Sequence, residues 1–401
     1  MRSLFSHRDF RLLLFGQGAS TLGDRLVFVA LAIYVTDIGT PTDVGIVLAC
    51  HAVPLVGFLL IGGVWADRLP RHLVVVTTDL IRFGLHALLA VLIFTGTVEI
   101  WHIAVIEACF GTAEAFFRPA LTGLVPQTVP ESEIQPARAA LGTLETVAEF
   151  VGPALATVLV LGLGAGWAFG LDAATFLVSA AFLIRLRPRE RGERAVRTTV
   201  LRELREGWTE VRSHTWIWVI VSAFSFALLT CFGPWMTLGP TVSIDSYDTA
   251  AVYGILTSAM GAGTIVGALI GFRWRPHHPM RTGMLLALPF PTVFGAFALG
   301  LPAAVLFPLF VLAGTGIALF DIWWQTALAE RVPPHMLSRV TSYDWMGSLA
   351  LLPIGYVLAG PLGEALGAAE VLAVGSGLAL AGLALAFTSS EVRRLAAATS
   401  P

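Results

Sequence analysis

Ionisable side chains interrupt several long apolar runs of this sequence, and such groups can exchange protons or bind a polar molecule. Asp24 and Glu149 each stand near the middle of a run, and Glu114 lies one helical turn before Arg118. An ionisable group at the centre of a bilayer costs about 2.5–3.5 kcal/mol on insertion scales, so each needs a partner, water or a function. A carboxylate in a partly dry cavity can be protonated near neutral pH, which lets it alternate between a proton and a substrate.

Each of these groups also has a purely structural interpretation. Asp24 can form a static pair with Arg25 or Arg82, and Arg118 can simply neutralise Glu114. Asp79 and Arg82 are three residues apart, so we expect them to form a structural charge pair. The sequence alone leaves both interpretations open for Asp24, Glu149, Glu114 and Arg118.

The elements that position these residues follow from composition. The chain has 401 residues, of which 56% are hydrophobic and 13% are charged, whereas an ordinary soluble protein is about 25% charged. This deficit excludes a water-soluble enzyme, a disordered regulator and a secreted disulfide scaffold. Cys50, Cys109 and Cys231 lie in apolar runs at unrelated spacings, so neither a disulfide nor a metal site is expected.

Apolar windows bounded by Arg, Pro or acidic clusters predict twelve membrane-spanning helices. Six of them fall in residues 1–185 and six in residues 215–401, with a cytoplasmic linker at 186–214 that contains an amphipathic stretch, Leu201, Leu204, Trp208 and Val211. The fold class is therefore an all-α integral membrane protein of two six-helix bundles. The predicted spans are 10–36, 42–66, 73–97, 101–126, 137–162, 165–185, 215–240, 250–272, 280–300, 303–329, 338–363 and 369–388.

The distribution of arginine predicts the orientation. All 25 basic residues are Arg, and apart from Arg25, Arg82 and Arg118 they lie at the termini or in alternate loops. Because loops that stay in the cytoplasm collect positive charge, both termini are predicted to be cytoplasmic.

An internal repeat relates the two halves at an offset of 203 residues. Val129 and Pro130 before span 5 match Val332 and Pro333 before span 11. Duplicated halves are common in transporters, whose pathway runs between the halves. At the same offset Arg118 corresponds to Asp321, so we expect these two charges to form a gate across the pathway; each could instead be satisfied within its own half.

The loop between spans 2 and 3 contains Gly63, Asp67, Arg68 and Arg71 at spacings that suit a small-residue helix contact and a charge lock. This pattern resembles the loop 2–3 signature of the major facilitator superfamily, although Pro70 stands where that family usually has glycine. The resemblance implies the twelve-helix major facilitator fold, alternating access and a conformational gate formed by Gly63, Asp67, Arg68 and Arg71.

Four further stretches resemble the exporter branch that includes enterobactin exporters and macrolide-efflux permeases. That resemblance implies export of a small organic molecule in exchange for protons. Where drug–proton antiporters often have an arginine in span 4, this chain has Glu107, so coupling through that arginine does not carry over. The four stretches are residues 22–25, 115–126, 152–156 and 253–267, which include the expected helix-packing residues Gly152, Pro153, Gly261 and Gly263.

Aromatic side chains within the spans are expected to line an apolar cavity for a bulky substrate, or else to face lipid at the interfaces. The candidates for the cavity are Phe116, Phe117, Trp235 and Trp323.

The function predicted from these observations is secondary active export, for example of a drug, a siderophore or a secondary metabolite. No phosphate-binding glycine-rich loop occurs, and the nine His are expected in loops and at helix ends without metal-binding or nucleophile–base spacing. We therefore expect no enzyme, cofactor, metal or nucleic-acid partner. The expected partners are a small molecule, protons and the lipid bilayer, and the chain is expected to be a monomer in a bacterial plasma membrane. The alternatives are an importer or facilitator, or a non-transporting membrane sensor.

Overall fold

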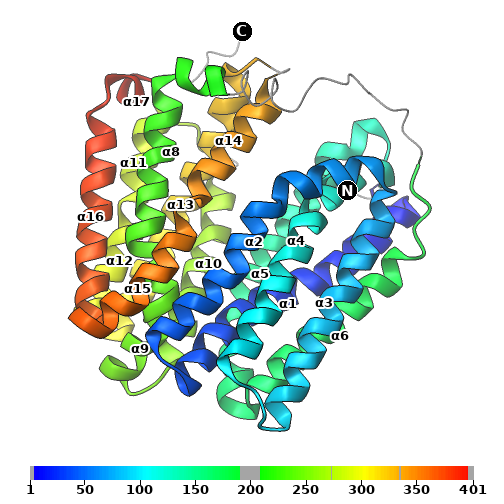
Figure 1. Ribbon diagram of the computed structural model, residues 1–401. Helices are drawn as coiled ribbons and strands as arrows, with labels where there is room; N and C mark the ends of the chain where they lie inside the picture. Colours follow the sequence, from blue (N-terminus) through cyan, green and yellow to red (C-terminus); the bar gives the residue numbers. More distant parts are fainter. Residues whose placement is uncertain (1–3, 190–207, 272, 334–335, 396–401) are drawn as a thin grey trace. The chain divides into compact units, whose positions relative to one another are not determined.

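The computed structural model of the chain describes residues 4–189, 208–271, 273–333 and 336–395. Its elements in these ranges are helices (Figure 1), and they group into two compact units, Met1–Glu193 and Arg194–Pro401. Eleven helices in the described ranges are long and apolar enough to cross a membrane.

Unit 1 contains six long helices. They are α1 (Arg8–Ile38), α2 (Pro41–Arg68), α3 (Arg71–Phe94), α4 (Ile100–Thr128), α5 (Ile134–Leu163) and α6 (Ala165–Leu183), with short 3₁₀ turns η1 (Leu4–Ser6) and η2 (Glu131–Glu133). Local chemistry explains the tight connections between them. A capping box formed by Thr40 and Asp43, followed by Pro41, starts α2, and Gly164 at φ 96° allows the turn from α5 to α6.

Unit 2 has more breaks because prolines interrupt its helices. Its elements are α8 (Thr215–Ala227), the π-helical turn η3 (Leu228–Phe232), α9 (Gly233–Tyr247), α10 (Ala251–Gly271), α11 (Pro279–Ala287), α12 (Pro289–Ala298), α13 (Ala303–Arg331), α14 (Leu337–Leu349), α15 (Leu352–Leu366), α16 (Ala368–Thr388) and α17 (Ser390–Arg394). Pro234, Pro289 and Pro353 follow the breaks between these segments. Each lacks an N–H group and clashes with the carbonyl of the preceding turn.

All twelve predicted spans correspond to these helices. The predicted span 280–300 is formed by α11 and α12 together, each of which is too short to cross a membrane alone, and span 338–363 is formed by α14 and α15. In the predicted linker, Leu201 and Leu204 lie outside the described residues. Residues 208–213 are helical, with Trp208 against the ring of Tyr343 and Val211 buried in the core of unit 2.

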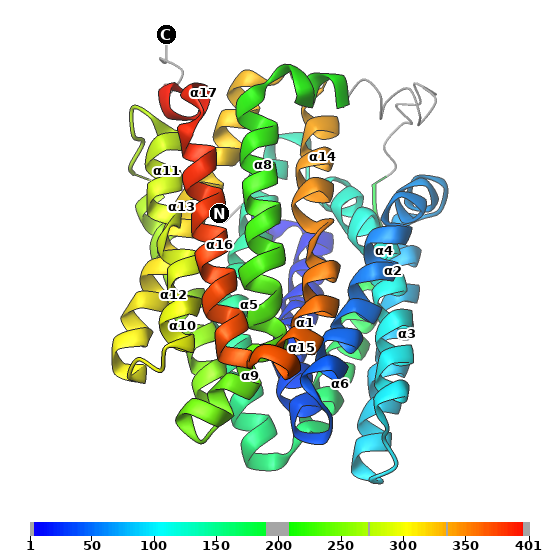
Figure 2. The same cartoon turned by 60° about the vertical axis from the view of Figure 1, so that its left-hand side comes forward.

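Equivalent helices pack in equivalent ways in the two units. Figures 1 and 2 both show α2 beside α4, where Gly111 brings α4 onto the carbonyl of His51; in unit 2 Gly314 brings α13 onto the carbonyl of Met260 in α10. Gly152 similarly lets α5 pack on α1, and Gly355 lets α15 pack on η3. The repeat seen in the sequence is therefore also a repeat of helix contacts.

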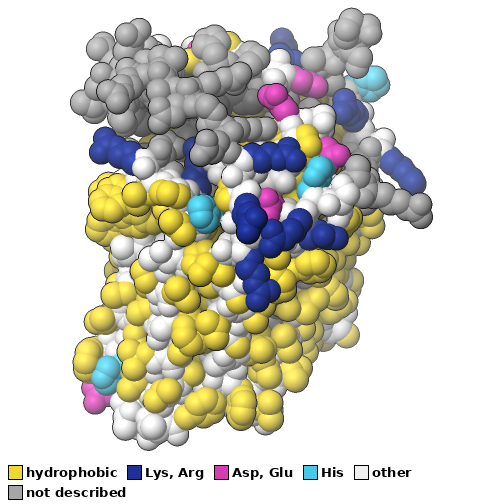
Figure 3. Space-filling model, turned by 90° about the vertical axis from the view of Figure 1, so that its right-hand side faces the viewer, with side chains coloured by type: hydrophobic (Ala, Val, Ile, Leu, Met, Phe, Trp, Pro, Cys, Tyr) yellow, Lys and Arg dark blue, Asp and Glu magenta, His cyan; other side chains and the backbone are white. Residues whose placement is uncertain are grey.

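One face of the molecule separates apolar from charged side chains. Figure 3 shows a face that is largely hydrophobic, with arginines gathered toward one end. Apart from Arg25 and Arg118, which lie within α1 and α4, the exposed arginines described in unit 1 lie at or near the N-terminal ends of α1 and α5 and the C-terminal ends of α2 and α6. The alternating directions of the helices place these ends together; the residues are Arg8, Arg11, Arg68, Arg138, Arg185, Arg187 and Arg189.

Candidate functional site

A cluster of charged side chains is buried within unit 1, contributed by α1, α2, α3, α4 and α6. We call it the buried charge cluster, and it consists of Asp24, His51, Asp79, Arg82, His86, Glu107, Glu114, Arg118 and Asp172. Burial of so many charges in a membrane span is expensive unless each has a partner, and every member of the cluster faces at least one group of opposite charge or a histidine.

Arg82 of α3 is fully buried and holds one side of the cluster. Its Nη2 lies 2.5 Å from Asp79 Oδ1 and its Nη1 lies 3.6 Å from Asp24 Oδ2. The guanidinium also stacks on the ring of Phe117, with its Cζ 3.9 Å from the ring centroid. Ser179 donates to the second oxygen of Asp79 at 2.7 Å. Asp79 and Arg82 therefore form the pair that the sequence predicted. Asp24 is a second carboxylate near Arg82, and it lies farther away and is more exposed.

Two histidines link the carboxylates on the other side. His86 Nδ1 lies 2.5 Å from Asp172 Oδ2, and His86 Nε2 faces Glu107 Oε1 at 3.6 Å. His51 Nδ1 lies 3.0 Å from Glu107 Oε2, and its Nε2 lies 3.0 Å from Glu114 Oε2. A continuous row of alternating acids and bases therefore crosses from α6 through α3 and α4 to α2.

Arg118 stands at the end of this row, next to Glu114. Its Nε and Nη2 both donate to Glu114 Oε1, at 2.8 and 2.6 Å, which leaves Oε2 to His51. The exposed fraction is 0% for the Asp172 side chain and 4% for Glu107, whereas it is 21% for His51, 15% for Glu114 and 52% for Arg118. The row is thus closed at Asp172 and opens at Arg118.

Glu149 is not part of the buried charge cluster. It pairs with Arg25 at 3.0 Å between α5 and α1, and both side chains are more than a third exposed. Gly152, one turn later, allows this approach because a side chain there would overlap the backbone of α1, and Pro153 is buried beside it.

The residues predicted to form the gate between α2 and α3 differ in their contacts and in their exposure. The close helix contact belongs to Gly62, which abuts the carbonyl of Ala115, whereas a side chain on Gly63 would meet nothing within 4 Å; the packing reason given for Gly63 was wrong. Arg71 donates to the carbonyl of Gly123 at 2.9 Å. Arg68 is exposed, and the side chain of Asp67 lies outside the described part of the chain.

In unit 2, Asp321 is exposed on α13. Gly263 of α10 abuts the carbonyl of Val311 in α13, and Gly261 is buried in the same helix. Gly263 therefore lies at a close contact between α10 and α13.

Three of the four aromatic predictions are wrong. Trp235 is 0% exposed and is surrounded by the rings of Tyr253, Phe294, Phe297 and Phe310, so it forms the core of unit 2 and lines no cavity. Trp323 is buried as well, and its indole donates to the carbonyl of Trp274. These rings sit inside the helix bundle because packing against other rings buries their large apolar area.

The other two aromatics lie in unit 1. Phe117 is buried against Arg82, so it supports the buried charge cluster and lines no cavity. Phe116 is half-buried and packs edge-on to Trp65.

The histidines are the functional residues that sequence reasoning missed. They were expected in loops and at helix ends, but His51 lies within α2 and His86 within α3. Asp172 of α6 is fully buried against His86 as well. A usable signal existed, because His51 and His86 are ionisable residues inside apolar windows just as Asp24 is.

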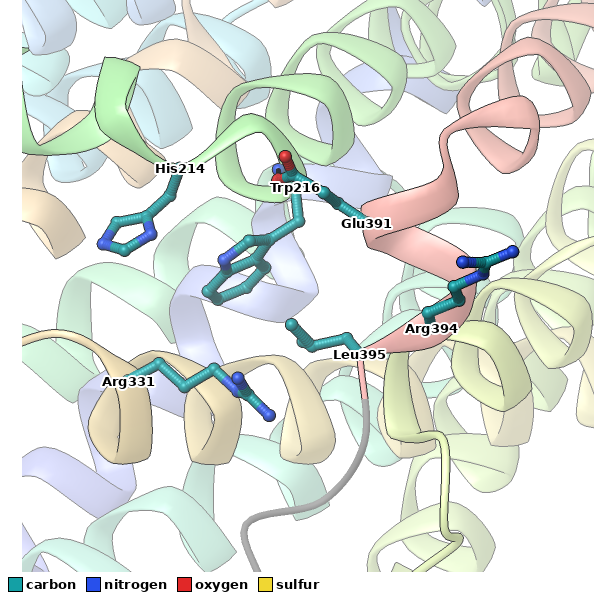
Figure 4. A pocket seen from close by; sticks show the side chains of 6 residues that line it. All are labelled: His214, Trp216, Arg331, Glu391, Arg394 and Leu395. Atoms are coloured by element: carbon teal, nitrogen blue, oxygen red, sulfur yellow. Dashed lines mark hydrogen bonds between the residues drawn. The ribbon is translucent and has the colours of Figure 1, made fainter.

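A pocket of about 700 Å³ opens in unit 2, near the end of α13 and against α17 (Figure 4). It is lined by His214, Trp216, Arg331, Glu391, Arg394 and Leu395. Glu391 accepts a hydrogen bond from the backbone N–H of Trp216 at 3.3 Å, which ties α17 to the start of α8. This pocket lies at a helix end and contains none of the residues of the buried charge cluster.

Comparison with known proteins assigns the chain to a class. The family model of the Major Facilitator Superfamily matches residues 13–349, so the chain belongs to that superfamily of membrane transporters, as its loop 2–3 pattern predicted. A point variant of the nucleoside transporter NupG superposes with a TM-score of 0.77 at 15% identity, over 95% of this chain and 98% of that one. The predicted twelve-helix fold of two pseudo-symmetric bundles is therefore confirmed.

Several of its relatives are efflux proteins. Macrolide efflux protein A of Streptococcus pyogenes is 23% identical over 365 residues, which cover 88% of each chain. Enterobactin exporter EntS of Citrobacter koseri is 26% identical over 404 residues, covering 98% of this chain and 94% of that one. The predicted resemblance to the exporter branch of the superfamily is confirmed by these relatives.

Proposed function

We propose that this transporter exports a small organic molecule by alternating access and takes up protons in exchange. The relatives that act on macrolides and enterobactin support export and suggest cargo of those kinds: a drug, a siderophore or another secondary metabolite. The buried charge cluster is the observation that carries proton exchange.

The charge balance of this cluster requires protons. It holds five carboxylates, of Asp24, Asp79, Glu107, Glu114 and Asp172, and only the two guanidinium groups of Arg82 and Arg118. Three negative charges without cations are very costly in a low-dielectric interior, so the cluster binds protons. Any change that brings in positive charge or water releases some of them. That is the property an antiporter needs.

Individual roles follow from exposure. Asp24 lies 3.6 Å from Arg82 and keeps a third of its side chain exposed, so it exchanges a proton or contacts cargo. Glu149 does the same through its half-exposed pair with Arg25. Glu114 and Arg118 form the accessible end of the acid–base row.

The remaining roles are conformational. Arg118 and Asp321 pair to gate the pathway, and Asp67, Arg68 and Arg71 lock the loop between α2 and α3. Half-buried Phe116 contributes to an apolar surface for cargo. The residues 1–185 and 215–401 move as two bundles, joined by the 186–214 linker.

The alternating arginine content of the loops supports an orientation with both termini in the cytoplasm of a bacterial plasma membrane. The transporter works as a monomer, since the charge cluster is complete within one chain.

The test uses everted membrane vesicles with an imposed pH gradient and a pH-sensitive dye. Addition of a macrolide or of enterobactin should dissipate the gradient in vesicles that contain the wild-type protein. The variant with both Asp24→Asn and Glu149→Gln should lose this response while it still inserts in the membrane. A wild-type protein that moves these compounds without disturbing the gradient would contradict proton exchange, and movement only toward the cytoplasmic side would identify an importer.

A further inference from the structure

His51 presents both of its ring nitrogens to carboxylates. Nδ1 faces Glu107 and Nε2 faces Glu114, each at 3.0 Å. A neutral imidazole has one N–H, so its second nitrogen would point a lone pair at the lone pairs of a carboxylate. The observed contacts are therefore both favourable only when His51 carries two protons or when one of the two acids is protonated.

His86 repeats this arrangement one step deeper. Its Nδ1 lies 2.5 Å from Asp172 Oδ2, and its Nε2 faces Glu107 Oε1 at 3.6 Å. Neither His86 Nε2 nor Glu107 Oε1 has a hydrogen-bond partner among the described residues. The two atoms face each other, so a proton on His86 Nε2 would be attracted to Glu107 Oε1. The row of acids and bases described above is called the histidine chain from here on. It consists of the side chains of Asp172, His86, Glu107, His51, Glu114 and Arg118, in that order in space.

Among the residues that the structure describes, the charges around the histidine chain supply no other cation to Glu107. On α3, Arg82 is taken up by Asp79 and Asp24, and Asp79 also accepts from Ser179 of α6. On α1, Asp24 adds a negative charge, and Arg25 is engaged by Glu149 of α5. The histidine chain has three carboxylates and one arginine, so it is neutral when it holds two further protons. Because each imidazole lies between two carboxylates, this geometry favours both protons on the histidines, as imidazolium cations.

We propose that His51 and His86 are held as imidazolium cations, and that the proton on His51 Nε2 is the one exchanged for cargo at Glu114. This proposal rests on the proposed function and assigns its cargo to the class of organic cations, such as amines. When a cationic group binds Glu114 Oε2, the N–H bond at His51 Nε2 breaks and its proton leaves to water. The neutral imidazole keeps Nδ1–H and donates it to Glu107. One positive charge arrives as another leaves, so the buried charge is unchanged.

The geometry of the chain suits a proton store better than a channel. Asp172 and His86 are at most 1% exposed, whereas Glu114 and Arg118 are accessible. Protons therefore enter and leave at the same end, and the closed end prevents a leak across the membrane.

The chemical state of the histidines can be measured without any cargo. The full-length protein is labelled with ¹⁵N-histidine in lipid nanodiscs at pH 7.5, and His51→Gln and His86→Gln assign the two signals. Both rings should show two protonated nitrogens. In Glu114→Gln the signal of His51 should change to one protonated and one bare nitrogen, while that of His86 stays. Glu133→Gln is the matched control, because Glu133 lies 2.9 Å from His7 and neither residue belongs to the histidine chain. This substitution should leave the signal of His51 unchanged. A bare nitrogen on His51 in the wild type would overturn the proposal.

Transport then separates this proposal from the function on which it rests. The probe is erythromycin, a macrolide that carries an amine, in proteoliposomes with and without a pH gradient. His51→Gln and His51→Lys should both lose gradient-driven accumulation, and elution of each purified variant as a single monodisperse peak in size-exclusion chromatography reports correct folding. His51→Lys keeps a fixed cation, so restored coupling in this variant would mean that His51 has only a structural role. If the wild type itself ignores the gradient, the proposed antiport fails; if it responds and His51→Gln responds equally, only the histidine assignment fails.

Discussion

Replacement of Arg82 by methionine tests how the buried charge cluster is held together. Arg82 is fully buried, 2.5 Å from Asp79, 3.6 Å from Asp24 and stacked on Phe117. Methionine fills much of the same volume against the ring but removes the cation. Asp79 then keeps only the hydrogen bond from Ser179. Loss of one partner from a buried ion pair costs about 3–5 kcal/mol, because the other charge is left without compensation.

Two further variants make the interpretation specific. Adding Asp79→Asn to Arg82→Met removes the stranded charge, so the double variant should recover about 2 kcal/mol or more of the free energy of unfolding. Arg25→Met is the matched control, since the Arg25–Glu149 pair has similar length but is half-exposed; it should cost about 0–1 kcal/mol.

The assay is unfolding of the purified protein in mixed micelles with increasing SDS, followed by tryptophan fluorescence. The reasoning is refuted if Arg82→Met is as stable as Arg25→Met, or if the double variant is less stable than Arg82→Met alone.

Three other changes have defined outcomes. Gly62→Ala should cost about 1–3 kcal/mol in the same unfolding assay, because its methyl group meets the backbone of α4, whereas the neighbouring Gly63→Ala should be tolerated; equal effects would contradict the packing. Trp235→Ala should cost about 3–5 kcal/mol without changing which of two cargoes is preferred in competition assays, and a changed preference would place Trp235 at the cargo surface. Transport lost in Arg118→Asp or in Asp321→Arg should return in vesicles when both changes are combined, and a double variant no better than the single ones would show that the two residues do not pair.

The helices were predictable from sequence because each one must satisfy its backbone inside lipid, which requires a long apolar run. The same argument does not show where a run breaks. The prediction treated 280–300 as one span, but Pro289 separates α11 from α12 within it. The packing of α2 on α4 depends on Gly62 rather than on Gly63, and the sequence contains both. Which of two adjacent glycines faces a neighbour depends on helix rotation, and a weakly amphipathic helix does not encode it.

The buried charge cluster was predictable only in part. Each embedded acid was visible as an exception in an apolar window, and the spacing of Asp79 and Arg82 indicated a pair on one helix. The contact of His86 with Asp172, by contrast, joins residues 86 positions apart on different helices. Spacing within a helix says nothing about such partners, so the row from Asp172 to Arg118 emerges only when α2, α3, α4 and α6 are packed together.

The most direct test of proton-driven export is the balance point of cargo and proton gradients in proteoliposomes. Purified protein is reconstituted with erythromycin on both sides, and the pH difference is varied until net flux stops. One pH unit corresponds to about 1.4 kcal/mol, a factor of about ten in concentration. For exchange of one proton per organic cation, a tenfold cargo gradient should be balanced by a difference of about one pH unit. A balance point that stays at equal cargo concentrations whatever the pH difference would contradict the account.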